Sequence, residues 1–138
     1  MLFKQLLQSG AIGYCQIDAT RLGGVNDVLA IILIAKKFKV PVCPHGGGIG
    51  LCNMILHYAV WDQIKVASHS KDQLVEYAEF LQDEVFINPI KVKDGSYLTP
   101  TAPGWGLEMH KKFLREHIYP TGKIWKDRVA SGGITFLP

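Results

Sequence analysis

Residues 15–50 read CQIDATRLGGVNDVLAIILIAKKFKVPVCPHGGGIG. Two short apolar runs that suit strands, Ile12 to Asp18 and Val40 to Pro44, flank a long helical pattern from Val25 to Phe38. A strand, a helix and a second strand with short connections predict a parallel βαβ unit, because parallel strands need a crossover between them. The predicted fold class is therefore α/β, as a barrel or a doubly wound sheet.

Helical spacing continues on both sides of this stretch. Apolar residues recur from Leu2 to Leu7, and Gly10 ends the run, which predicts a short opening helix. The glycine cluster in residues 46–50 opens another helix, from Leu51 to Trp61. For the central helix we expect Asn26 or Asp27 as the N-cap, with basic side chains near its negative end: Lys36, Lys37 and Lys39.

After Trp61 the pattern is weaker. Ile64 to Ala67 suits a short strand, whereas Gln73 to Leu81 fits either a strand end or the start of a helix. Proline and glycine then mark an irregular segment. In it we expect strand pieces at Ile90 to Val92 and Tyr97 to Thr99, a last helix over Glu108 to His117, and an extended or mobile tail from Tyr119.

Composition argues against several classes of protein. A net charge of +3 from scattered lysines is too small for a nucleic-acid surface. The longest apolar run, Val28 to Ala35, is far short of the roughly 20 residues of a membrane-spanning helix. Lys4 interrupts the start where a signal peptide would be apolar. The chain has an odd number of cysteines, which favours reduced thiols: Cys15, Cys43 and Cys52. We therefore expect a cytoplasmic location, with mitochondria as the alternative.

Three ionisable residues lie where predicted strands end. Asp18 ends the first strand, His45 ends the second, and Glu76 stands in the run Leu74 to Tyr77. The carboxyl ends of parallel strands meet on one face, so these side chains are candidates for one site. A carboxylate next to an imidazole fixes its tautomer and suits it to general acid and base catalysis near neutral pH.

Each candidate also has a simpler interpretation. Asp18 could be a solvated carboxylate or pair with Arg21. The glycines after His45, including Gly46 and Gly47, could approach an anionic substrate or only form a tight turn. The spacing of cysteine and histidine around His45 does not match a closed zinc site. We assign no role to the remaining histidines: His57, His69, His110 and His117.

Two motifs, Gln16-Ile17-Asp18-Ala19-Thr20-Arg21-Leu22-Gly23-Gly24 and Pro44-His45-Gly46-Gly47-Gly48-Ile49-Gly50-Leu51-Cys52, resemble the later barrel strands of acid-sugar dehydratases in the enolase superfamily. The similarity is to the L-fuconate and L-galactonate types and extends to about Asp127. It implies the C-terminal part of an enolase-type (β/α)7β TIM barrel. Residues 1–84 would form the last βα units, 85–127 a segment returning onto the barrel and its capping region, and 128–138 a mobile tail.

The resemblance also implies a reaction. A proton is removed next to a sugar-acid carboxylate, the enediolate is stabilised by Mg²⁺, and the 3-hydroxyl leaves as water to give a 2-keto-3-deoxy acid. His45 and Asp18 would be the acid/base dyad, with His45 protonating the leaving hydroxyl. Glu76 would hydrogen-bond the substrate carboxylate or enediolate, and the other substrate-binding residues would be Arg21, Gly46 and Gly47.

The metal ligands and the lysine base of that family lie on earlier barrel strands, so we expect no metal ligand in this chain. A complete barrel needs about 250 residues. We therefore expect the isolated chain to be an inactive fragment of a hydro-lyase that forms homo-oligomers and binds a small sugar acid. The alternatives are a non-catalytic interaction module derived from a dehydratase, or a small phosphate-binding protein that uses the glycine loop.

Overall fold

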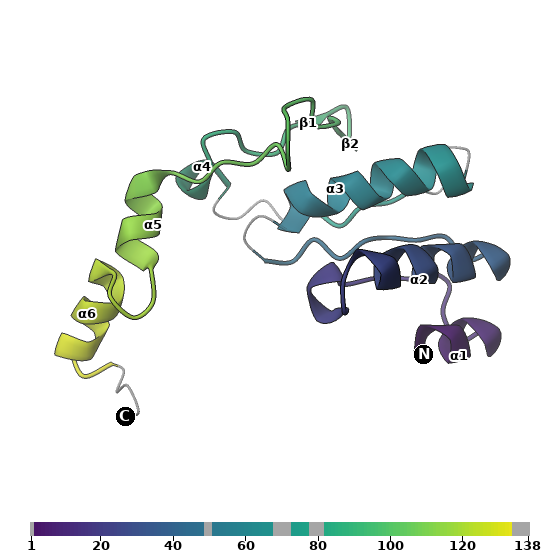
Figure 1. The fold of residues 1–138 in the computed structure, drawn as a ribbon, viewed down its shortest axis with the longest axis horizontal. Helices are drawn as coiled ribbons and strands as arrows, with labels where there is room; N and C mark the ends of the chain where they lie inside the picture. Colours follow the sequence, from purple (N-terminus) through teal and green to yellow (C-terminus); the bar gives the residue numbers. More distant parts are fainter. Residues whose placement is uncertain (1, 49–50, 68–72, 78–81, 134–138) are drawn as a thin grey trace.

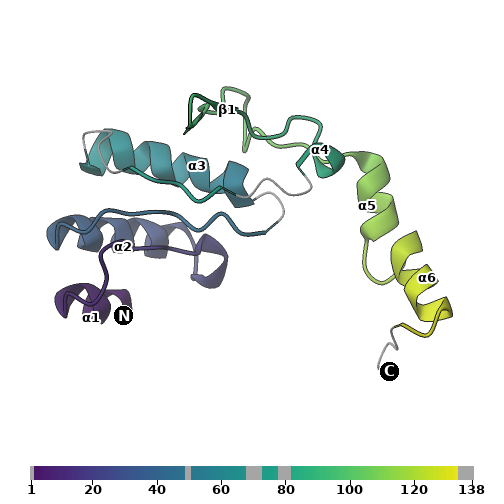
Figure 2. The same cartoon turned by 180° about the vertical axis from the view of Figure 1, so that it is seen from behind.

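The computed structural model describes residues 2–48, 51–67, 73–77 and 82–133. Three helices and the extended segments beside them form the larger part, and a pair of short helices stands apart at one end (Figures 1 and 2). The helices and strands in chain order are α1 Leu2–Gln8, the 3-10 helix Ala19–Arg21, α2 Val25–Lys37, α3 Leu51–Trp61, the π-helix Asp62–Ala67, α4 Gln82–Val85, β1 Val92–Lys93, β2 Ser96–Tyr97, α5 Lys111–His117 and α6 Lys123–Ala130.

Parallel pairing joins the extended segments. Cys15 and Val42 form a parallel bridge, and the His45 N–H donates to the Ile17 carbonyl at 2.8 Å. The Glu76 N–H donates to the Pro44 carbonyl at 3.2 Å, which adds a third segment beside the second. The two expected strands therefore pair as predicted, although the regular pairing is shorter than the apolar runs.

The core lies between these segments and α2. Its buried apolar side chains come from α1, both paired segments, α2 and the π-helix: Leu7, Cys15, Ile17, Val28, Ile31, Ile32, Ala35, Val42 and Val66. Fully burying one large aliphatic side chain contributes about 1.5–3 kcal/mol. The apolar pattern of α2 thus explains why this helix covers the paired segments.

The start of α2 differs from the expectation. Its N-cap is Gly24, so the prediction of Asn26 or Asp27 is wrong. Asp27 lies in the first turn and its carboxylate accepts the Gly23 N–H at 3.0 Å. A Cβ on Gly23 would lie 2.8 Å from that carboxylate oxygen, and Gly24 has φ 143°, so two glycines suit the entry to the helix.

Two further predictions are wrong. Ile64 to Ala67 is not a strand, because the chain continues from α3 into the π-helix Asp62–Ala67, which packs on α2. The segment from Tyr119 is not extended throughout, because α6 covers Lys123–Ala130. Trp125 Nε1 donates to the His117 carbonyl at 2.8 Å and ties α6 to α5. Sequence periodicity misses α6 because the helix buries no side chain.

The segment between Val85 and Met109 is held at both ends. Phe86 pairs with Met109 in an antiparallel bridge, and the β1–β2 hairpin turns at Asp94 and Gly95, which both have positive φ. The strands overlap the expected pieces at Val92 and Tyr97 only. The last expected helix begins at Lys111 rather than Glu108, because residues 108–110 carry the bridge.

Candidate active site at three strand ends

His45 lies between two carboxylates. Its Nδ1 is 2.6 Å from Glu76 Oε2, and its Nε2 is 3.9 Å from Asp18 Oδ2. The three residues end the three paired segments, which explains why residues far apart in sequence meet. The shorter contact involves Glu76, whereas Asp18 is beyond hydrogen-bond distance. The structure thus brings the three candidates together, with Glu76 as the nearer partner of the imidazole.

Glu76 is held tightly by its surroundings. Its Oε2 accepts the Gly46 N–H at 2.6 Å as well as facing His45. The side chain is 37% exposed, so the carboxylate is open to a ligand while two donors meet one of its oxygens. The short contact between Glu76 Oε2 and His45 Nδ1 fixes the orientation of the imidazole ring.

Asp18 is held in its ionised form. It caps the 3-10 helix, and its Oδ1 accepts the Thr20 N–H at 2.9 Å and the Thr20 hydroxyl at 2.6 Å. The Thr20 hydroxyl bond is the largest cause that lowers the pKa of Asp18, and the nearby His45 and Arg21 lower it further. Asp18 is therefore a fixed negative charge beside His45 at neutral pH.

Arg21 contacts Asp18 rather than standing apart from it. Its Nε is 3.0 Å from Asp18 Oδ2, and its side chain is 84% exposed. Asp18 is thus both a partner of Arg21 and a neighbour of His45 in this geometry. An exposed pair of this kind adds little stability.

The glycines after His45 make room for the site's own side chains. A Cβ on Gly46 would lie 2.6 Å from the Glu76 carbonyl oxygen, and one on Gly47 would lie 2.6 Å from His45 Cε1. The Glu76 carboxylate already accepts the Gly46 N–H, so this amide is not open to a phosphate. Ile49 and Gly50 of the same cluster lie outside the described residues.

Two supporting residues escaped the sequence analysis. Tyr97 donates its hydroxyl to the Glu76 carbonyl at 2.9 Å, and Cys52 donates its thiol to the Gly46 carbonyl at 3.1 Å. Cys52 is fully buried, and its thiol is free, in line with the expected reduced state. No local pattern marks Tyr97, because its partner belongs to a strand end in another part of the chain.

These residues do not fit a magnesium ion. Within the described ranges, no group of three or more His, Cys, Asp or Glu side chains could hold a metal. Mg²⁺ prefers oxygen ligands in octahedral geometry, whereas here an imidazole ring separates Asp18 from Glu76. An imidazole between two carboxylates is an arrangement suited to hydrogen bonding and proton transfer.

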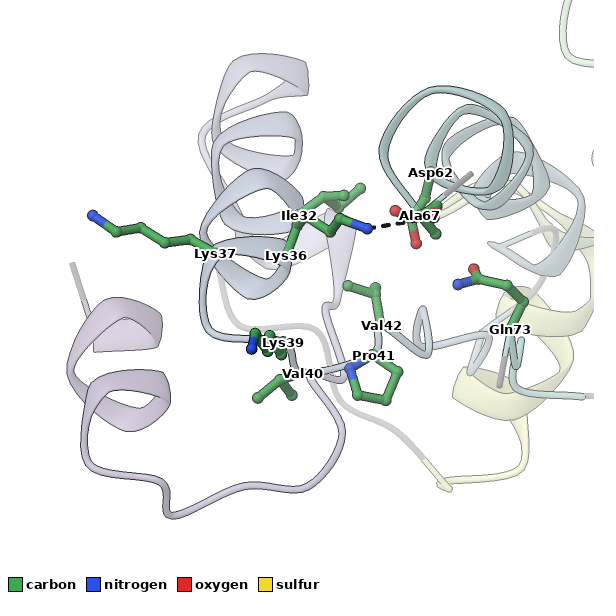
Figure 3. A pocket seen from close by; sticks show the side chains of 10 residues that line it. All are labelled: Ile32, Lys36, Lys37, Lys39, Val40, Pro41, Val42, Asp62, Ala67 and Gln73. Atoms are coloured by element: carbon green, nitrogen blue, oxygen red, sulfur yellow. Dashed lines mark hydrogen bonds between the residues drawn. The ribbon is translucent and has the colours of Figure 1, made fainter. Parts of the chain in front are cut away.

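A separate cavity of about 480 Å³ lies at the other end of the paired segments, near Val40 and Gln73. Figure 3 shows Lys36 directed toward Ala67, whose carbonyl accepts its Nζ at 3.4 Å, while Lys37 points away. Lys36 and Lys37 lie in the last turn of α2, as predicted. Both lysines lie near negative helix ends, where a positive charge is stabilising.

The family model for enolase C-terminal domain-like proteins matches residues 1–113. The chain belongs to this family. Human mitochondrial enolase superfamily member 1 is 42% identical over 91% of the chain, and L-galactonate dehydratase of Hypocrea jecorina is 44% identical over 89%. The crystal structure of the human protein superimposes over 91% of the chain with a TM-score of 0.83 at 43% identity.

A further solved structure, L-talarate dehydratase from Polaromonas sp. JS666 complexed with Mg and L-glucarate, superimposes over 80% of this enolase-family chain with a TM-score of 0.63 and 28% identity. The chain covers 26% of that structure and 28% of the human one. It is thus similar to somewhat over a quarter of these relatives.

Family membership settles the fold. The chain has the α/β fold of the C-terminal part of an enolase-type TIM barrel, and the paired segments with α2 and α3 are its βα units. His45, Asp18 and Glu76 lie at the carboxyl ends of such strands, the face where barrel enzymes carry their active sites. No helix within the described part of the chain is long and apolar enough to cross a membrane.

Proposed function

We propose that the chain acts as the C-terminal part of a hydro-lyase that dehydrates an L-galactonate- or L-fuconate-type sugar acid to a 2-keto-3-deoxy acid. The observation that carries this proposal is the imidazole of His45 held between Glu76 and Asp18 at the ends of three parallel segments. The relative named L-galactonate dehydratase supports the substrate class, at 44% identity.

In this proposal His45 is the general acid. Glu76 meets Nδ1 and orients the ring, so that Nε2 carries the proton to be transferred. The Nε2 proton moves to the oxygen of the departing hydroxyl as the C–O bond breaks, and water leaves. The Asp18 carboxylate, whose pKa is lowered chiefly by the Thr20 hydroxyl, lies 3.9 Å from Nε2 and places a negative charge beside the atom that transfers the proton.

Arg21, Gly46 and Gly47 have supporting parts in the proposal. Arg21 would contribute charge toward the acid group of the substrate, because its side chain is 84% exposed beside Asp18. The two glycines would let His45 and Glu76 stand close together. Mg²⁺ would be a cofactor of the complete enzyme, held by residues outside this chain, as the Mg complex of the talarate enzyme suggests.

The test is an assay of the complete enzyme that contains this segment, with L-galactonate and L-fuconate as substrates and detection of 2-keto-3-deoxy acid. Magnesium-dependent product from either acid is expected, with none from the 138-residue chain alone. Absence of product from the complete enzyme with both acids would refute the substrate class. Product from the isolated chain would refute its dependence on the rest of a barrel.

The alternative is a non-catalytic interaction module. Exposed apolar side chains favour it, because apolar surface promotes association. They lie on α2, the π-helix and the segment before Tyr77: Leu33, Ile64 and Leu74. Light scattering of the purified chain separates the two ideas. A defined dimer without dehydratase activity in any longer form would support the module, and a monomer would count against it.

Two properties of the complete protein follow as proposals. We expect it to form homo-oligomers, which light scattering of the complete enzyme would test. We also expect a cytoplasmic location, with mitochondria as the alternative that the name of the human relative supports. Fractionation of cells that express the tagged complete protein distinguishes the two compartments.

A further inference from the structure

We propose that Tyr97 is a positioning residue that holds Glu76 against His45, so that the segment returning after the barrel strands forms the back wall of the active site. This inference rests on the proposed function for its catalytic consequence only. Tyr97 acts through the main chain of Glu76, whose carbonyl accepts its hydroxyl at 2.9 Å.

The main chain of Glu76 is held from two sides. On the barrel side, its N–H donates to the Pro44 carbonyl at 3.2 Å. On the other side, its carbonyl accepts the Tyr97 hydroxyl, with the Cys52 thiol also directed to it at 3.8 Å. Among the described residues, removing the hydroxyl would leave only the Cys52 sulfur near this carbonyl, at 3.8 Å. A thiol is a poor donor, and this one lies closer to the Gly46 carbonyl, at 3.1 Å.

The side chain of Glu76 depends on this position. Its Oε2 lies 2.6 Å from both the Gly46 nitrogen and His45 Nδ1. Both distances are at the short end of hydrogen-bond range, so a small shift of residue 76 lengthens one or both. Gly46 cannot follow such a shift freely, because its own carbonyl accepts the buried thiol of Cys52 at 3.1 Å.

Tyr97 is itself placed by the β1–β2 hairpin. Positive φ angles at Asp94 and Gly95 close the turn, and the Leu98 N–H donates to the Lys91 carbonyl at 2.8 Å beyond the strands. The centroid of the Tyr97 ring lies 5.9 Å from that of the Tyr77 ring. Tyr77 directly follows Glu76 in the sequence. Figure 1 shows the hairpin above α3. Its turn and its own hydrogen bonds define its geometry.

The first arm of the test measures His45 directly in the 138-residue chain, by NMR of ¹⁵N-labelled histidine. We expect an Nδ1 resonance that reports a proton shared with a carboxylate. Tyr97→Phe removes one oxygen atom and should abolish that signature. Tyr14→Phe is the matched control, because it removes a hydroxyl from a 44% exposed tyrosine on another segment and should leave His45 unchanged.

An unchanged His45 signature in Tyr97→Phe would overturn the proposal. Loss of the signature together with general loss of core amide resonances would also overturn it, because the hydroxyl would then support the fold as a whole. Cys52→Ser offers a second variant. A serine hydroxyl still donates to the Gly46 carbonyl, so His45 should keep its signature there and lose it only when Tyr97→Phe is added.

The second arm measures catalysis in the complete enzyme. Tyr97→Phe should lower kcat about tenfold, which corresponds to about 1.4 kcal/mol, and leave KM within about twofold, because substrate contacts remain. A matching change in KM with kcat intact would overturn positioning as the mechanism. If the complete enzyme dehydrates no sugar acid, the proposed function fails, whereas the NMR result still decides the role of Tyr97.

Discussion

The helices of this chain fall into two regions that differ in how they are stabilised. α2 buries Val28, Ile31, Ile32 and Ala35 against the paired segments, while neither α5 nor α6, both fully described, buries a side chain. The pair α5–α6 is held by local contacts, such as the edge-to-face rings of Tyr119 and Trp125 at 5.2 Å. Precise side-chain geometry at the site is therefore built on the region with a core.

This difference teaches where function depends on packing. The site lies at the ends of segments that the core holds in place. We therefore expect substitutions in the site to affect catalysis directly, independently of the α5–α6 pair. In Figure 2 the pair projects away from α1, α2 and α3. Substitutions in the two regions should thus have effects of very different size, from loss of turnover for His45 to almost no effect for a residue of α5.

The largest effect should follow His45→Ala in the complete enzyme. Loss of the general acid should lower kcat by about 10²–10⁴-fold, the usual contribution of a positioned proton donor. Steady-state kinetics with L-galactonate measure it. His110→Ala, in the exposed region before α5, is the control and should keep turnover within about twofold. Similar losses in both variants would remove the distinction between the regions.

A large loss of stability should follow Ile31→Ala in the core. Ile31 is 1% exposed, so the truncation leaves a cavity and should cost about 2–5 kcal/mol in the free energy of unfolding. Urea unfolding of the chain followed by circular dichroism measures the cost. A loss below about 1 kcal/mol would mean that the cluster around α2 is not a packed core in solution.

Gly46→Ala tests whether the glycine loop belongs to the region with precise packing. A Cβ there would lie 2.6 Å from the Glu76 carbonyl oxygen, a main-chain atom that cannot rotate away. We expect overpacking to cost about 1–3 kcal/mol in unfolding free energy and to lengthen the Glu76–His45 contact. Gly48→Ala is not a suitable control because its φ is 111°, so Gly13→Ala, with open space around it, serves instead.

The contribution of Asp18 to the stability of the region with the core should depend on pH. Its folded-state pKa is lowered, so its contribution to stability is present above the unfolded pKa of about 3.9 and is lost as pH falls through the lower folded value. Thr20→Val removes the hydroxyl that is the largest cause of the shift. The variant should lose about 1 kcal/mol at pH 7 and less at pH 2.5.

Urea unfolding of the wild type and of Thr20→Val across that pH range measures the effect. Thr101→Val, in the exposed irregular segment, is the matched control and should show no pH-dependent loss. Equal losses at pH 7 and pH 2.5 in Thr20→Val would show that the hydroxyl stabilises the turn itself rather than the ionised carboxylate.

How far the sequence predicts this molecule differs between the same two regions. The βα units were predictable because burial of α2 and of the paired segments imposes period on the apolar residues. Asp18, His45 and Glu76 could be placed together because each ends a parallel segment. The contact of Tyr97 with Glu76 could not, since nothing local to either residue encodes it. α6 was missed because an exposed helix needs no apolar period.

The smallest effect should follow Leu114→Ala in α5. Leu114 is 46% exposed, so its truncation in this chain should change the unfolding free energy by less than about 0.5 kcal/mol, compared with several for Ile31→Ala. Urea unfolding measures both variants under the same conditions. A loss above about 2 kcal/mol for Leu114 would show that the α5–α6 pair packs against another surface in solution, because a side chain that remains half exposed cannot contribute so much.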